Sequence, residues 1–266
     1  MKSNIILLLL LLTSIMLKAQ SNKSGIINYQ RTYYGDTLEF ATITEEALLF
    51  NETEASYFYV KFIKSFRNPD LKVEATAPRV TQYNNFNNKI IISAIRTPTG
   101  YYLVQDDMAA ITWRMLNQTK KIQNIDCFGA MAEYRGRVWT VWYAPSIPVS
   151  SGPWKLYGLP GMILEAEDLK GLIKYECSSI IIPPSRDLKI GKPTPIKQRN
   201  EVPISIKEFA TLNEKEIVNA EKLHSRQDKD SGSGRLYQVY DIEIFAFEKN
   251  ITLKRRQQKL SDIPKK

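Results

Sequence analysis

The chain has 266 residues, of which 43% are hydrophobic and 24% charged, and its formal net charge is +9 at pH 7. It contains a single histidine, His224, and two cysteines, Cys127 and Cys177. Ser-His-Asp and Cys-His nucleophilic sites would both depend on that one imidazole, and these three residues offer too few ligands for a zinc site. We therefore expect no catalytic residue, no metal and no cofactor.

Residues 1–19 are typical of a secretory signal peptide. Lys2 supplies the positive start, residues 5–12 the apolar core, and Leu17-Lys18-Ala19 the cleavage site. The apolar run is shorter than the roughly 18–20 residues that cross a bilayer, so we expect no transmembrane span in the mature chain. The sequence thus predicts an exported protein.

Most of residues 20–248 consist of short segments in which apolar and polar residues alternate, separated by turn residues. The predicted strands are Ile26–Tyr34, Leu38–Ile43, Ser56–Phe62, Ile90–Arg96, Tyr101–Val104, Val138–Tyr143, Met162–Ala166 and Leu172–Ile182. Many short strands with turns between them favour an antiparallel sandwich or barrel over βαβ units. Without a long linker or an internal repeat, we expect one β domain over residues 20–248.

One segment is convincingly helical. Ser205 and Glu208 form a Ser-x-x-Glu capping box, and the helical pattern continues to Arg226. Asn213 and Glu216 repeat the cap signal, so the segment is either one helix or two short ones. After a Gly/Ser loop at residues 231–234, residues 235–247 alternate again and are expected to return to the sheet. The tail, residues 249–266, is strongly basic and either stays solvated or contacts an anionic surface.

Export would place Cys127 and Cys177 in an oxidising compartment, where a structural disulfide is stable. Both lie in strand-like segments, so a bond requires adjacent strands with Cα atoms within about 7 Å. The sequence leaves a disulfide and two free thiols as equal alternatives.

The stretch from Gly152 to Ala166 reads GPWKLYGLPGMILEA. Within it, residues 159–162 suit a type II turn, because Pro160 fixes φ at the second position and Gly161 accepts a positive φ at the third. The turn would start the strand Met162–Ala166. We expect its one charge, Glu165, to pair with Arg135 or Arg137.

This stretch resembles the signature of the GLPGLI family of exported Bacteroidetes-type proteins, with Met162 where the family has leucine. The similarity begins upstream at Trp113 and continues through Cys127, the turn at residues 135–137, and Trp142. The resemblance implies a protein of unassigned activity in the periplasm or at the outer-membrane periphery of a Gram-negative bacterium. It also implies a layout similar to open β-barrels of the lipoprotein-carrier type, although a shared fold does not assign a function.

The function that we favour is non-enzymatic binding of a hydrophobic ligand, acyl chain or peptide in a curved antiparallel sheet or open β-barrel, with residues 205–226 as a lid. The motif is then either an architectural turn or the rim of the ligand cavity. The candidate cavity or motif residues are Arg137, Trp139, Trp142, Trp154, Tyr157, Gly158, Leu159, Pro160, Gly161 and Glu165.

Two other functions are compatible with the sequence. An interaction or assembly protein would dock on an outer-membrane protein partner through an edge strand or the basic tail. A carboxylate-dependent hydrolase ranks last, because it needs Glu165 and a second acid to converge in a pocket. Export separates the chain from nucleic acid, so we expect no nucleic-acid partner.

Overall fold

The structure is a computed structural model that describes residues 23–34, 42–65, 79–97, 100–184, 189–194, 198–213 and 215–216. Within these ranges, twelve strands form one sheet in the order β12-β6-β5-β4-β3-β2-β1-β11-β10-β9-β8-β7. Their bounds are Gly25–Tyr33 (β1), Thr42–Phe50 (β2), Glu54–Ser65 (β3), Arg79–Asn85 (β4), Ile90–Thr97 (β5), Gly100–Asp107 (β6), Arg114–Ile122 (β7), Ile125–Tyr134 (β8), Arg137–Ala144 (β9), Met162–Asp168 (β10), Ile173–Ile181 (β11) and Ile204–Ser205 (β12).

The sheet consists of two antiparallel meanders. Strands β1 to β6 pair in chain order, and so do β7 to β11. The meanders join along β1 and β11, where Ile26 pairs with Ile181 and Tyr33 with Ile173. The short β12 is the exception, since it pairs with β6 in parallel.

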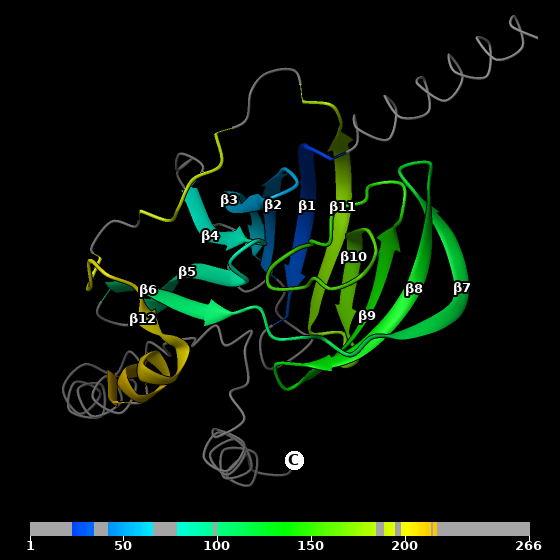
Figure 1. Cartoon of the computed structure of the whole chain (residues 1–266). Helices are drawn as coiled ribbons and strands as arrows, with labels where there is room; N and C mark the ends of the chain where they lie inside the picture. Colours follow the sequence, from blue (N-terminus) through cyan, green and yellow to red (C-terminus); the bar gives the residue numbers. More distant parts are fainter. Residues whose placement is uncertain are drawn as a thin grey trace, which may run out of the picture.

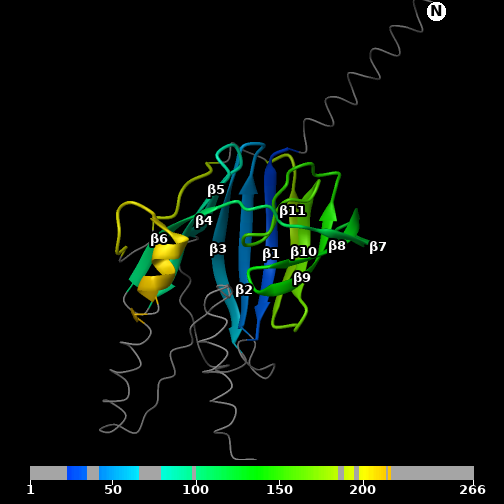
Figure 2. The ribbon, with the colours of Figure 1, turned by 60° about the horizontal axis from the view of Figure 1, so that its bottom comes forward.

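The sheet is strongly curved, with β4–β6 in one wing and β7–β9 in the other (Figures 1 and 2). Register shifts interrupt five of the strand pairs, β1/β11, β9/β10, β2/β3, β3/β4 and β7/β8. Irregularities of this kind bend a strand and increase its twist, which accounts for the curvature.

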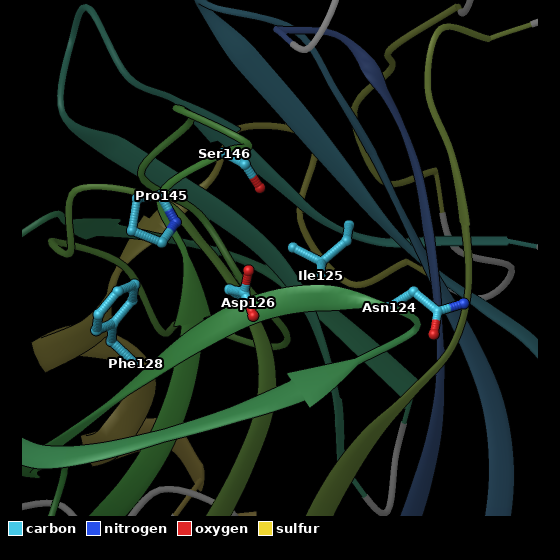
Figure 3. A pocket seen from close by; sticks show the side chains of 6 residues that line it. All are labelled: Asn124, Ile125, Asp126, Phe128, Pro145 and Ser146. Carbon is cyan, nitrogen blue, oxygen red and sulfur yellow. The ribbon is translucent and has the colours of Figure 1, made fainter.

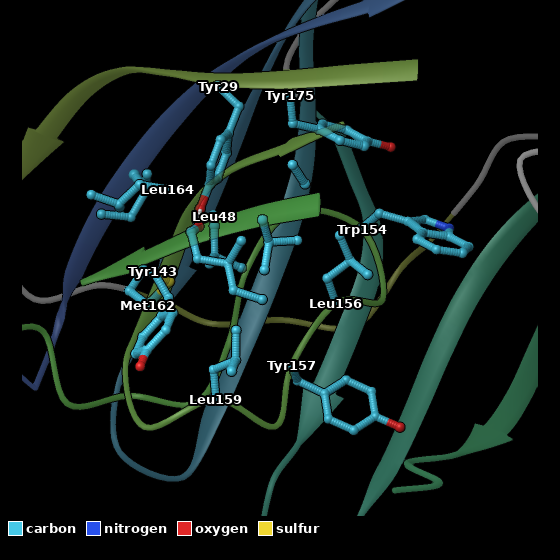
Figure 4. Packing of buried hydrophobic residues seen from close by; sticks show 14 of the residues in the cluster. Tyr29, Leu48, Tyr143, Trp154, Leu156, Tyr157, Leu159, Met162, Leu164 and Tyr175 are labelled. Atoms are coloured by element: carbon cyan, nitrogen blue, oxygen red, sulfur yellow. Dashed lines mark hydrogen bonds between the residues drawn. The ribbon is translucent and has the colours of Figure 1, made fainter. Parts of the chain in front are cut away.

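The hydrophobic core lies on the inner face of this curve. Trp139, Tyr29 and Tyr175 are its largest fully buried aromatic side chains. Residues 145–161, here called the crossing loop, connect β9 to β10 and pass in front of the central strands (Figure 1). Leu156 and Leu159 of this loop are buried in the same cluster (Figure 4).

The predicted fold class is confirmed: the chain is mainly β, with a curved antiparallel sheet and a helix. The helix occupies residues 206–213 and 215–216. The Glu208 amide donates a hydrogen bond of 3.2 Å to Ser205 Oγ, as the capping box predicts. Phe209 packs edge-on against Tyr102, so the described helix covers the β6 end of the sheet, beside β12 (Figure 1).

Several expectations concern other parts of the chain. The signal segment at residues 1–19, His224, the strand at residues 235–247 and the tail at residues 249–266 lie outside the described residues. No helix in the described ranges is both long and apolar enough to cross a membrane.

Candidate functional site

The crossing loop is held in place by backbone hydrogen bonds to its own neighbours. The amide of Met162 donates to the carbonyl of Ile147 (3.0 Å), and the amide of Ile163 donates to the carbonyl of Ser151 (2.8 Å). The Gly158 amide donates to Ser150 Oγ at 2.8 Å. The loop therefore folds back along the start of β10 as an ordered insert.

Two aromatic residues of the loop pack between the wings of the sheet. The Trp154 ring lies 5.5 Å from that of Trp139, and its carbonyl accepts a hydrogen bond of 2.6 Å from Gln82 Nε2 on β4. Tyr157 donates its hydroxyl to the carbonyl of Ala109 (2.5 Å) and accepts at its own carbonyl from Trp113 Nε1 (2.8 Å). Of the predicted cavity residues, Trp139 and Trp154 meet, and Tyr157 reaches them through Tyr134, whose ring contacts both Trp154 and Tyr157. All three are buried core residues; Figure 4 shows Trp154 and Tyr157.

A buried ionic cluster joins the loop to both wings. Asp106 on β6 pairs with Arg135, in the turn between β8 and β9, and with Lys155 of the loop, whose Nζ lies 3.2 Å from Asp106 Oδ2. The Lys155 side chain is only 2% exposed and that of Arg135 is 19% exposed. Burial by itself lowers the pKa of Arg135, but its hydrogen bond to Asp106 contributes to a net rise above the ordinary value. We call these three residues the ionic clasp.

The prediction that Glu165 pairs with Arg135 or Arg137 is wrong. Glu165 pairs with Lys120 of β7, whereas Arg137 pairs with Asp168 at 2.9 Å and Arg135 belongs to the clasp. The cause is the strand register: with an irregularity in the β9/β10 pairing, Glu165 lies opposite Trp142, and Asp168 lies opposite Trp139. Along β10, the inward-facing Ala166 and Asp168 are buried, and Glu165 points to the opposite, outward face. On that face its partner Lys120 also lies over the Trp142 ring, with Nζ 4.5 Å from the ring centroid.

The predicted type II turn is also wrong, because Gly161 is not among the glycines with positive φ. The left-handed conformation occurs at Gly158 (φ +93°) and at Trp154 (φ +53°). Gly161 is needed for close packing instead: an added Cβ would lie 2.7 Å from the carbonyl carbon of Ala144. Of the other three residues of this segment, Leu159 and Met162 are buried and Pro160 is exposed.

Cys127 and Cys177 are both free and buried in the structure. Burial is the largest cause that raises the pKa of Cys127 to about 11 and that of Cys177 to about 12. Both thiols are therefore protonated and poorly nucleophilic at neutral pH.

A second buried polar cluster was not predicted. Glu46 on β2 accepts hydrogen bonds from the Tyr57 hydroxyl (2.5 Å) and from Thr44 Oγ1 (3.0 Å), and its Oε1 lies 3.1 Å from Arg31 Nε. The available signal was the pair of acids Glu45 and Glu46 within residues 42–50, and only the assignment of this segment to a strand shows which of them faces the core.

An open hollow of about 350 Å³ lies at the rim of the inner face, at the start of the crossing loop, and an added Cβ at Gly161 would lie 2.9 Å from Cα of its lining residue Pro145. We call it the rim hollow (Figure 3); its lining residues are Asn124, Ile125, Asp126, Phe128, Pro145 and Ser146. Phe128 is 42% exposed and packs on Tyr143, whose hydroxyl lies 3.8 Å from Sδ of Met115, itself 55% exposed. None of the ten candidate residues taken from the motif and its surroundings lines this hollow.

Among the described residues, no group of three or more His, Cys, Asp or Glu side chains is arranged to hold a metal ion.

Comparison with known proteins gives one family match and several solved structures. A family model described as a protein of unknown function (Porph_ging) matches residues 132–165, from β8 into β10, and no curated protein matches the chain. The solved protein PNGF-II is similar in two crystal forms. In the C2 form the match has 18% sequence identity, covers 62% of this chain and 28% of PNGF-II, and has a TM-score of 0.40. In the P21 form it has 16% identity, covers 73% of this chain and 34% of PNGF-II, and has a TM-score of 0.43. The chain therefore spans about a third or less of the length of PNGF-II. A Vibrio parahaemolyticus domain assigned to outer membrane lipoprotein sorting has 7% identity over 66% of this chain and 92% of its own, with a TM-score of 0.25.

Proposed function

We propose that the chain is an exported, non-enzymatic protein of the cell envelope that binds a hydrophobic ligand at the rim hollow. The observation that carries this proposal is the exposure of Phe128 and Met115 beside a hollow on the inner face of the curved sheet. The signal-like start of the sequence and its GLPGLI-like stretch, which overlaps the family match over residues 132–165, support export.

The centre of the inner face does not offer room for a ligand. Trp154, Leu156 and Leu159 of the crossing loop are buried there, against the strands that a carrier-type ligand would occupy. A ligand that leaves the loop in place must enter at the rim. This favours the architectural interpretation of the motif and moves the proposed binding site to β8 and the first two residues of the crossing loop, Pro145 and Ser146.

The rim hollow suits a small apolar group. Its volume lies near the lower end of the roughly 300–1,000 Å³ that ligand pockets span. Ile125, Phe128 and Pro145 supply an apolar surface, and Asn124 and Asp126 supply polar atoms at its border. The ligand class that fits is the end of an acyl chain, or an apolar peptide side chain, with a polar donor beside it.

The arrangement of the acidic residues supports binding over hydrolysis. Glu165 does have a second carboxylate near it, because it lies opposite Glu176 on the neighbouring strand. Each of the two acids is engaged by a lysine, Glu165 by Lys120 and Glu176 by Lys174. They lie on the outward face and are partly exposed, where an ion pair is the ordinary state of a surface acid.

A fatty-acid titration tests the proposal. We expect the purified mature protein to bind a fluorescent medium-chain fatty acid saturably, and Phe128→Ser to weaken that binding about tenfold through loss of apolar contact. Leu169→Ser is the matched control. Leu169 is also an exposed apolar residue, but it follows the C-terminal end of β10 and does not line the rim hollow. Equal affinity in both variants, or no saturable binding by the unaltered protein, would refute the rim hollow as the site.

A further inference from the structure

The two edges of the sheet differ in whether another segment of the chain covers them. At the β6 edge, residues 198–205 of the chain itself run alongside the strand. Tyr101 bridges to Gln198, and the Tyr101 carbonyl accepts from the amide of Arg199 at 2.8 Å. The side chain of Asn200 bonds both the amide and the carbonyl of Leu103, each at 2.9 Å. The backbone groups of this edge are therefore satisfied within the chain.

The β7 edge has no such cover among the described residues. β7 is the last strand of the sheet order, paired with β8 on one side only, and it forms the outer rim of its wing (Figure 1). Six of its nine residues are exposed. An edge strand of this kind presents unpaired amides and carbonyls to solvent, which is a template for pairing with another extended chain.

The side chains of β7 select which chain can pair. Its sequence, RMLNQTKKI, contains three cations, Arg114, Lys120 and Lys121, and no acid. Arg114 donates to Met131 Sδ at 3.3 Å, and no described carboxylate pairs with it. The ion pair of Lys121 with Asp126 is largely exposed, so water and salt screen it and a partner acid can compete for the lysine.

We infer that β7 is a docking edge for an extended acidic segment of a partner protein, which adds to the sheet as a further strand beside Thr119–Ile122. That part of β7 keeps regular pairing with β8, from Thr119 opposite Phe128 to Ile122 opposite Ile125, so its free side has the geometry of a normal strand. The shift between Met115 and Thr119 disrupts the ladder before this point. This inference is independent of the rim hollow.

A second copy of the chain is a poorer occupant than an acidic strand. Pairing two β7 edges would bring six cations into one ladder without an acid from either strand. Like charges close together across a ladder are destabilising, whereas the glutamates of an alternating partner strand all lie on one face, where they meet Lys121 or, in the other register, Lys120. The cations thus disfavour self-association and favour an acidic partner.

Two peptides of equal charge separate strand addition from simple ion pairing. The first is a soluble peptide of about eight residues in which glutamate alternates with valine, and the second is the same peptide with every backbone amide N-methylated, so that no residue can donate a backbone hydrogen bond. We expect the full chain to bind the first peptide and not the second, and amide hydrogen exchange of residues 119–122 to slow only with the first.

Charge variants complete the test. Lys121→Gln is expected to weaken binding of the glutamate-valine peptide up to roughly fivefold, since that is what one exposed charge is worth. Lys61→Gln is the matched control, because Lys61 is an exposed, ion-paired lysine on β3, which has neighbours on both sides. Equal binding of both peptides, unchanged exchange at residues 119–122, or equal losses in the two variants would each overturn the inference, as would a β7-dependent homodimer at low salt.

Discussion

Replacement of Asp106 by asparagine is expected to destabilise the fold, because Asp106 is the carboxylate that holds the ionic clasp. The change keeps the shape of the side chain but removes the charge that faces Arg135 and Lys155. Breaking a buried ion pair by removing one partner costs about 3–5 kcal/mol. We expect about 3 kcal/mol, the low end of that range, since Arg135 retains some contact with water and asparagine still accepts a hydrogen bond.

That loss is large beside the total stability of a domain, which is about 5–15 kcal/mol. For a chain of this size it corresponds to a fall of roughly 6–12 °C in Tm. Urea unfolding, followed by tryptophan fluorescence, measures it directly, because Trp154, the residue before Lys155, packs on the buried Trp139. Asp126→Asn is the control, since it breaks the exposed pair with Lys121 and is expected to cost less than about 1 kcal/mol.

The refuting result for the clasp is an unfolding midpoint for Asp106→Asn that equals that of Asp126→Asn. A further variant checks the mechanism. Adding Lys155→Met to Asp106→Asn removes the buried cation as well, and it is expected to recover part of the lost stability because an apolar side chain of similar length avoids the desolvation penalty. If the double variant is instead less stable than Asp106→Asn alone, the packing of Lys155 contributes more to stability than its charge.

The remaining predictions concern the motif and the thiols. Gly161→Ala is expected to lower the free energy of unfolding by about 2 kcal/mol, because the new methyl group would press on the backbone of Ala144. Gly191→Ala is the control and should leave the free energy of unfolding unchanged, since no atom lies within 4 Å of its new methyl group. Equal urea unfolding midpoints for the two variants would contradict this prediction. Cys127 and Cys177 should resist alkylation in the native protein near neutral pH and react after denaturation, since burial raises the pKa of each thiol; rapid native labelling would be the contrary result. Between pH 9 and 11 the folded state keeps thiol protons that the unfolded state loses, so the free energy of unfolding should fall as pH rises through that window, and urea midpoints measured across it give the sign.

The sequence predicted several strands whose inward positions are filled by large apolar residues, although the predicted strand Leu38–Ile43 overlaps β2 only at residues 42–43 and no prediction covers β4. Predicted segments match β1, β9, β10 and β11 to within a few residues, because their buried and exposed positions alternate clearly. It missed β7, an edge strand that is mostly exposed and lacks a clear alternation of apolar and polar residues. It also missed β8, where Ala130 and Ala132 face inward; Ala132 lies opposite the large Trp139, so a small residue is needed there although alanine is a weak strand former.

The candidate site shows where sequence reasoning fails. The motif residues were identified, yet their role depended on which side chains meet across the sheet. The pairing of Glu165 with Lys120 follows from an irregular register that no local pattern encodes. The rim hollow combines a hairpin end near Asn124 with Pro145 at the end of another strand, and neither has a distinctive motif.

The junction between the two meanders has a kinetic consequence. Ile26 meets Ile181 there, so the first described strand to leave the ribosome must wait for almost the last before its second side is paired. Neighbouring hairpins close quickly, while a seam between such distant segments closes slowly and limits the overall folding rate. Before β11 pairs with β1, the apolar side chains of Ile27 and Tyr29 and the unpaired backbone edge of β1 are exposed. This stretch is therefore the expected binding site for a chaperone during folding.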